Sequence, residues 1–146
     1  MKTVVLTLVA VTLLLVPAFG VQAEEDPKLY ALGMISASNI YFSYLVLGTV
    51  ADGYASGGYG ADMARNLTEE AIALTRTSID ALELLRGDAG VADEDLEVVN
   101  GLIETHELLL GQANGLLSYI DDPDDRDDFL HYRDLAWRNI SSMLDL

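Results

Sequence analysis

The stretch from Leu29 to Ala51 has no charged residue, in a chain that contains 24 Asp and Glu and 8 Lys and Arg. A segment of this kind is expected to be buried, either among other helices or in a bilayer. Serines and Asn39 interrupt it, and its larger side chains step by three and four positions, as on one face of a helix. This predicted face consists of Leu32, Ile35, Asn39, Phe42 and Val46. We therefore predict the most buried helix of a bundle, with membrane insertion through residues 29–51 as the alternative.

The N-terminus has the order of a cleavable export signal. Lys2 precedes an unbroken apolar run from Val4 to Val16, and small residues stand at the positions that a signal peptidase reads. The run is short for a bilayer span, and no positive flank follows it. We expect a signal peptide at residues 1–23, cleavage after Ala23, and a periplasmic or extracellular domain at residues 24–146. An uncleaved membrane anchor is the alternative.

The acidic composition limits the partners of the chain. With the leader removed, 7 Lys and Arg stand against 24 Asp and Glu, which gives a formal charge of −17. Such a field repels nucleic acid and anionic lipid, so we expect no nucleic acid partner and no stable membrane association. The chain has no cysteine, which excludes disulfides and thiolate metal sites. Stability then has to come from one packed core.

Three further segments show helical spacing. The first covers residues 61–86 and ends at Gly87, a residue suited to a helix C-cap. The second begins near Asp93, where acidic side chains favour a helix start. The third is predicted to begin at Asp122, with Pro123 at its first position. The side chains that we assign to the buried faces are Met63, Leu67, Ala71, Leu74, Ser78, Leu82, Leu85, Leu96, Val99, Ile103, His106, Leu110, Ala113, Leu117, Ile120, Phe129, Tyr132, Ala136, Ile140 and Met143.

The pattern of segments predicts an all-α fold. No stretch shows the period-two alternation of a strand. Short connections make neighbouring helices antiparallel, so the expected architecture is a single up-down-up-down four-helix bundle after a cleaved signal peptide. The step from Gly111 to Gly115 allows another helix to approach closely. That helix belongs either to the same chain or to a second protomer, and a homodimer is therefore one of the predicted states.

His106 is the candidate for chemistry inside the predicted bundle. Hairpins centred near residues 56, 90 and 122 would place it in a polar layer at mid-height. The other members of this layer would be Asn39, Thr75 and Trp137. His106 is then either a ligand or proton acceptor in a small cavity, or a core histidine bonded to Asn39 or to a nearby hydroxyl. We favour the core histidine, because buried polar groups generally find partners.

The spacing of carboxylates and histidines does not favour a metal or haem cofactor. Di-iron bundles use Glu-x-x-His pairs on their helices. Here Ile103 stands three residues before His106, and Asp128 stands three residues before His131. We therefore predict no cofactor and no metal ligands.

The densest polar side chains are predicted at one end of the bundle. A glycine-rich loop contains Tyr54 and Tyr59, and an acidic run begins at Asp121. The up-down topology places this loop and this run at the same end, where aromatic faces beside carboxylates suit a cation. A solvated loop beside an acidic helix cap is the alternative. The ligand-binding residues that we predict are Tyr54, Tyr59, Asp121, Asp122, Asp124, Asp125 and His106.

The sequence favours binding over catalysis. Nucleophile–base pairs, phosphate-binding loops and multi-ligand metal sets do not occur at recognisable spacing. We predict an exported, non-enzymatic module that binds an unknown protein or a small cationic ligand at the loop end. The alternatives are a small enzyme or redox protein that uses His106 or His131, and a small membrane protein inserted through residues 29–51.

Overall fold

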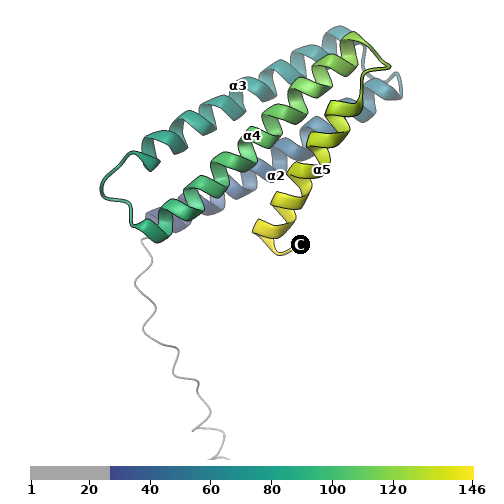
Figure 1. The fold of residues 1–146 in the computed structure, drawn as a ribbon. Coiled ribbons are helices and arrows are strands. Elements are labelled where there is room, and N and C mark those ends of the chain that lie inside the picture. The colour runs from purple at the N-terminus through teal and green to yellow at the C-terminus, as the bar shows by residue number, and fades with distance from the viewer. Residues whose placement is uncertain (1–26) are drawn as a thin grey trace, which may run out of the picture.

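The computed structural model describes residues 27–146, and the predicted signal peptide lies outside them. The described part contains four helices and no strand. The helices are α2 (Pro27–Ala55), α3 (Ala61–Arg86), α4 (Asp93–Asp121) and α5 (Asp127–Leu144). Successive helices run antiparallel and form an up-down-up-down bundle (Figure 1). The predicted all-α four-helix bundle is therefore confirmed.

Helix α4 lies at the centre of the bundle. It packs against α2, α3 and α5, whereas α3 and α5 do not touch each other within the described residues. The large side chains that are fully buried include Ile40, Leu47, Leu109, Leu116 and Ile140. Full burial of such a side chain stabilises a protein by about 1.5–3 kcal/mol. The core therefore follows α4 and the helix faces that are turned toward it.

Helix α2 is not the most buried helix, and that prediction is wrong. Its inward face is narrow and consists of Ala37, Ile40, Leu47, Gly48, Val50 and Ala51. Ile35 and Phe42, which the spacing placed in the core, are each 67% exposed. The physical reason is that residues 29–51 of α2 are uncharged on all sides of the helix, so its apolar spacing does not specify which side faces inward.

The buried face of α3 also differs from the predicted one. Met63, Leu67 and Leu74 are exposed, and the buried residues are Ala64, Thr68, Ala71, Ile72, Thr75 and Leu82. The hydroxyls of Thr68 and Thr75 donate hydrogen bonds to the carbonyl oxygens of Ala64 and Ala71, at 2.8 and 2.7 Å. A threonine bonded in this way can be buried without an unpaired donor. The predicted face of α3 is based mainly on apolar residues and therefore lies about one residue away from the observed buried face.

Two glycines bring α5 close to α4. A Cβ atom added at Gly115 would lie 2.5 Å from the backbone nitrogen of Phe129, and one added at Gly111 would collide with the ring of Tyr132. Real Cβ atoms do not approach other atoms this closely, so α5 can sit here only against glycine. Of the two predicted uses of this glycine step, the structure shows packing within the chain.

Helix α5 begins later than predicted and is short. Its first residue is Asp127 rather than Asp122. An Asp122 carboxylate oxygen accepts a hydrogen bond from the backbone nitrogen of Asp124 at 3.1 Å, and the Asp122 carbonyl accepts one from Asp125 at 2.9 Å. Aspartates that bond to the backbone in this way favour a turn over a helix. As a result α5 has 18 residues, whereas α4 has 29.

Candidate functional site

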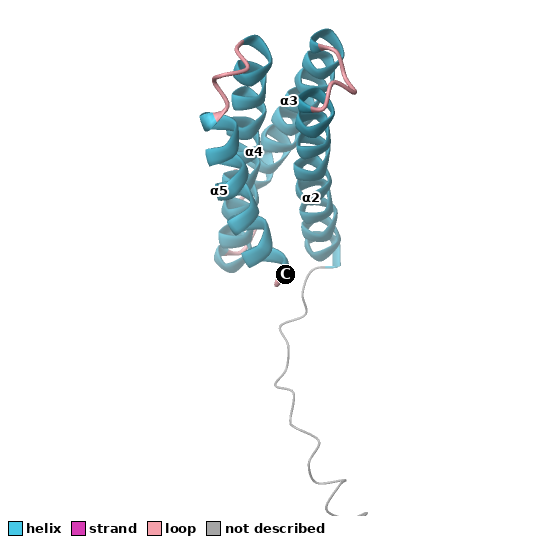
Figure 2. Ribbon diagram, turned by 90° about the vertical axis from the view of Figure 1, so that its right-hand side faces the viewer, coloured by secondary structure: helices cyan, strands magenta, loops and turns pink. Residues whose placement is uncertain are grey.

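The glycine-rich loop and the acidic turn lie at the same end of the bundle, as the topology predicted (Figure 2). The Tyr54 hydroxyl donates a hydrogen bond to the backbone carbonyl of Ile120 at 3.2 Å. The Tyr54 ring meets the ring of Tyr119 edge-on, with centroids 5.4 Å apart. Arg65, in the first turns of α3, forms an ion pair with Asp121 at the end of α4. These contacts join the two connections.

The two predicted loop tyrosines pack against the protein, and only Tyr59 lies in the loop, because α2 continues to Ala55 and includes Tyr54. Both rings are half-buried and contact the hydrophobic core. The Tyr59 ring covers Gly53 so closely that a Cβ atom there would overlap it. The Tyr59 backbone nitrogen also donates to the Gly53 carbonyl at 2.9 Å. Tyr54 and Tyr59 therefore close this end of the bundle and hold the loop in place.

The carboxylates of the acidic turn point into solvent. Asp121, Asp122, Asp124 and Asp125 are all exposed. The hydrogen bond and charge of Asp121 raise the pKa of Arg65. Within residues 27–146, no group of three or more Asp, Glu or His side chains is arranged to hold a metal ion. The geometry at this end is that of an acidic helix boundary with one ion pair.

His106 is completely buried on α4, but its partner is not the predicted one. Its Nδ1 lies 2.8 Å from the carbonyl oxygen of Leu102, so Nδ1 carries the proton and donates it. Asn39 is exposed and accepts a hydrogen bond from Ser43, and the predicted polar layer through Asn39 does not form. Burial lowers the pKa of His106, and the bond to Leu102 opposes this shift. His106 is therefore neutral at neutral pH and shielded from solvent.

Two buried side chains keep polar atoms without a protein partner in the described structure. These atoms are Nε2 of His106 and both amide atoms of Gln112. Internal water usually fills such positions. His131, the other histidine, lies exposed on α5 with its ring 5.4 Å from that of Tyr132. The two histidines therefore occupy different environments, one sealed and one open.

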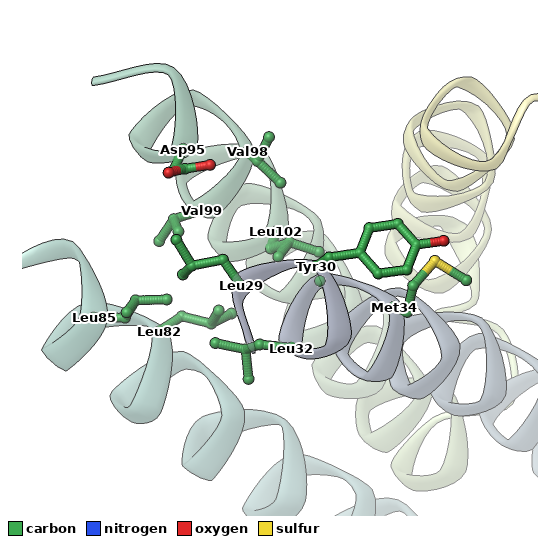
Figure 3. A pocket seen from close by; sticks show the side chains of 11 residues that line it. Leu29, Tyr30, Leu32, Met34, Leu82, Leu85, Asp95, Val98, Val99 and Leu102 are labelled. Carbon is green, nitrogen blue, oxygen red and sulfur yellow. The ribbon is translucent and has the colours of Figure 1, made fainter. Parts of the chain in front are cut away.

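An apolar pocket lies at the opposite end of the bundle, beside the α3–α4 turn. It has a volume of about 250 Å³ and is open to solvent on one side. Figure 3 shows the side chains that surround it. They come from α2, α3 and α4 and are Leu29, Tyr30, Leu32, Met34, Leu82, Leu85, Asp95, Val98, Val99 and Leu102, with Gly33 on the wall. We refer to this hollow as the open corner.

The open corner exists because α5 ends before it reaches this part of the bundle (Figure 1). No residue of α5 lines the pocket. Tyr30 and Met34 of α2 and Val98 of α4 are consequently more than half exposed. Among the described residues that line the hollow, Asp95 is the only charged one. The arrangement is an apolar wall with a single carboxylate at its edge.

The sequence predicted none of these pocket residues. Helical spacing identifies apolar faces but not the place where a neighbouring helix stops. The clue in the sequence is the short length of the last segment, and a predicted start at Asp122 hides it. Asp95 belongs to the acidic first turn of α4, as expected near Asp93, and also lines the pocket.

Helix α2 is long and apolar enough, by length and composition, to cross a membrane. Only 33% of its most apolar window is buried inside the bundle. Core helices of soluble proteins and N-terminal export signals can pass the same test. In the described fold Ile40 and Leu47 of this helix are packed in the core. Its opposite side carries apolar residues, Ile35 and Phe42 among them, that no other helix of the described part covers.

Comparison with known proteins gives no relative for this chain. No protein-family model matches it, and neither a curated protein nor a solved structure matches it.

Proposed function

We propose that the protein is an exported, non-enzymatic binding module that takes up a small amphipathic ligand with a cationic group in the open corner. The observation that carries this proposal is the apolar hollow with the single carboxylate of Asp95 at its edge. Apolar pockets with few, well-placed polar groups are typical of small-molecule sites. The predicted ligand class, a small cation, is kept, and its predicted place moves from the loop end to the open corner.

Shape and polarity of the hollow suit the apolar part of such a ligand. Leu82, Val99 and Leu102 form a floor that is almost fully buried. Tyr30 and Met34 stand at the sides and are more than half exposed, so they can close over a bound chain. Methionine and tyrosine adapt well to such a role, because the thioether is flexible and the ring is amphipathic. Covering these side chains would remove apolar surface from water, which favours binding.

The negative charge of the protein supports the proposal that the ligand has a cationic end. Asp95 is partly buried, and its carboxylate belongs to an acidic chain with a formal charge of −16. A field of one sign raises the local concentration of oppositely charged ligands. An anionic amphiphile would be repelled by the same field. The proposed preference is therefore for an ammonium group over a sulfate or carboxylate on the same apolar chain.

Export is part of the proposal. The apolar N-terminal segment is compatible with an export signal, and the absence of cysteine places no redox demand on the compartment. N-terminal sequencing of the secreted protein is expected to begin at Glu24. A mature protein that still contains the apolar run would contradict a cleaved leader.

Titration calorimetry with octylammonium, octyl sulfate and octanol tests the ligand class. We expect saturable binding of octylammonium at a single site and much weaker binding of octyl sulfate. Asp95→Asn should weaken octylammonium binding about tenfold, which corresponds to ~1.4 kcal/mol, and should leave octanol binding unchanged.

Asp93→Asn is the matched control. Asp93 lies in the same first turn of α4, is exposed, and does not line the pocket. Both substitutions remove one charge from the same helix end, so their effects on helix stability should be similar. Equal loss of octylammonium affinity in the two variants, or no saturable binding to the parent protein, would contradict the proposed site.

A further inference from the structure

The outward side of α2 carries a regular row of exposed residues. Their positions alternate between steps of four and three, as along the contact line of a coiled coil. They are Ala31, Ile35, Ser38, Phe42, Leu45 and Thr49, and every one of them is exposed. We call this row the outer seam. It contains no charge, in a chain with a formal charge of −16.

The polar members of the outer seam are already hydrogen-bonded within α2. The Ser38 hydroxyl donates to the carbonyl oxygen of Met34, and the Thr49 hydroxyl donates to that of Leu45, both at 2.8 Å. Each hydroxyl would keep its carbonyl acceptor if another surface covered it. The entire outer seam can thus be buried with little free-energy cost from its polar groups.

We propose that two copies of this chain pair through the outer seam in an antiparallel, two-fold symmetric dimer. In this arrangement Phe42 of each copy packs against Ser38 of the partner subunit. The inference concerns α2 alone and does not depend on ligand binding at the open corner. The spacing of the seam requires a helix as its partner, and the following residue pairs identify that helix as a second α2.

Side-chain sizes match in the antiparallel alignment. With Phe42 opposite Ser38, Ile35 falls opposite Leu45 of the partner subunit and Ala31 falls opposite Thr49. The largest side chain then faces a small one, and the two branched aliphatic side chains face each other, as interdigitated packing requires. A parallel alignment would instead place Phe42 against Phe42 and Ser38 against Ser38.

Charges at the two ends of the seam match in the same alignment. Lys28 and Asp52 are the charged residues that bound the uncharged stretch, and both continue the heptad spacing of the seam. The antiparallel alignment places Lys28 of each copy opposite Asp52 of the partner subunit. A parallel alignment would place Asp52 against Asp52, which is unfavourable between two acidic chains. The charge pattern therefore favours one orientation.

A lipid surface is the less suitable occupant. Helices that lie on membranes carry Lys and Arg on their polar side, whereas Lys28 is the only basic residue in α2. The acidic surface of the rest of the chain is repelled by anionic lipid. Insertion of α2 across a bilayer would also remove Ile40 and Leu47 from the core. A second copy brings the same uncharged surface and no such penalties.

The length of the seam sets the strength of the expected dimer. From Ala31 to Thr49 a helix extends about 28 Å. One helix pair of this length lies at the lower end of the size range of specific interfaces. We therefore expect a reversible dimer with a Kd in the micromolar range rather than an obligate one.

Sedimentation velocity of the purified chain over a concentration series tests association through the seam. The parent protein should change from monomer to dimer in the micromolar range. Phe42→Lys should raise the Kd by tenfold or more and leave the helical circular dichroism spectrum unchanged. Leu84→Lys is the control, because Leu84 is 79% exposed on α3 and lies outside the seam, and it should dimerise like the parent. A parent protein that stays monomeric up to millimolar concentration, or a Phe42→Lys variant that still dimerises, would overturn the proposal.

Cysteine cross-linking tests the orientation, since the chain has no cysteine of its own. Ile35→Cys and Leu45→Cys proteins should cross-link when mixed, and neither should cross-link efficiently with itself. Efficient disulfide formation by Ile35→Cys alone would indicate a parallel pair and would overturn the antiparallel alignment.

Charge exchange tests the ends of the seam, and lipid provides the competing outcome. Lys28→Asp should weaken the dimer several-fold, and the double variant Lys28→Asp with Asp52→Lys should restore it. Failure of the double variant to recover affinity would contradict the proposed pairing. Flotation of the parent protein with phosphatidylcholine vesicles, lost in Phe42→Lys, without a dimer in solution would assign the seam to lipid instead.

Discussion

The α4–α5 contact and the outer seam of α2 are both rich in small and apolar residues, yet one is tightly closed and the other is open. At the α4–α5 contact, Gly115 lets the backbone of α5 approach so closely that even a methyl group would not fit. Along the outer seam, Phe42 is 67% exposed, and no helix within residues 27–146 covers it. The comparison shows that apolar character alone does not place a helix face in the core. Glycine positions and the extent of packing against neighbouring helices decide it.

The same comparison explains why α4 rather than α2 organises the fold. α4 has a helix on three sides, and its buried residues accordingly include polar ones such as Thr105, His106 and Gln112. α2 also contacts all three other helices, but it packs less extensively against α3 and α5 than α4 does. A more polar helix can thus be more deeply buried than one with a long uncharged stretch when its position in the bundle demands it.

The largest effect that separates the two regions is expected from truncating their large side chains. Leu116 on α4 is fully buried, so Leu116→Ala should lower the free energy of unfolding by about 2–5 kcal/mol. Phe42→Ala should lower it by about 0.5 kcal/mol when the protein is dilute and monomeric, because an exposed side chain loses few contacts. Urea unfolding monitored by circular dichroism measures both.

Protein concentration sharpens this first test. The cost of Phe42→Ala should increase at concentrations where the parent protein is dimeric, because dimerisation stabilises only the folded state. The cost of Leu116→Ala should not depend on concentration. If Phe42→Ala were as damaging as Leu116→Ala in dilute solution, α2 would be oriented differently from the described fold.

The second test adds one methyl group to α4 at two glycines. Gly115→Ala should destabilise the protein by about 1–3 kcal/mol, because the new Cβ would meet the backbone of Phe129. Gly101→Ala is the matched control on the same helix, since a Cβ there meets nothing within 4 Å. It should stabilise the protein by about 0.5–1 kcal/mol through helix propensity. Thermal unfolding of the two variants beside the parent measures the difference, and a tolerated Gly115→Ala would refute the close approach of α5.

These two regions also show what the sequence could and could not predict. Long segments with three-four spacing and short turns determined the number of helices and the antiparallel order. The boundaries of α3, Ala61 and Arg86, were predicted correctly because a glycine stands directly before and after the helix. The start of α5 was missed because Asp122 bonds to the backbone of its own turn. The spacing of apolar residues along the sequence does not reveal local hydrogen bonding of this kind.

The candidate site was less predictable than the fold. The topology correctly brought Tyr54 and Asp121 to one end, but whether a tyrosine ring faces solvent or packs on Gly53 depends on side-chain contacts. The open corner depends on where α5 ends relative to α4, which no single segment specifies. His106 was correctly expected in the core, but its partner on its own helix was not the expected one across the bundle.

The smallest expected effect is a dependence of stability on pH, which arises from His106 on the buried side of α4. Burial lowers the pKa of His106 below its ordinary value near 6.5. Below pH 6.5 the unfolded chain therefore binds a proton that the folded chain does not. His106 should accordingly reduce stability as the pH falls from 6.5 toward its folded pKa, by up to about 1.4 kcal/mol per pH unit. His106→Leu should remove this slope and retain the stability of the parent at pH 7.5.

His131→Leu is the control, because it removes the other histidine, which is exposed on α5. Urea unfolding at pH 7.5, 6.5 and 5.5 measures all three proteins. Since the three proteins share every carboxylate, the difference between variants isolates the histidine. A parent protein and a His106→Leu variant with the same pH dependence would mean that His106 can be protonated in the folded bundle, and the sealed environment inferred for the centre of α4 would then have to open.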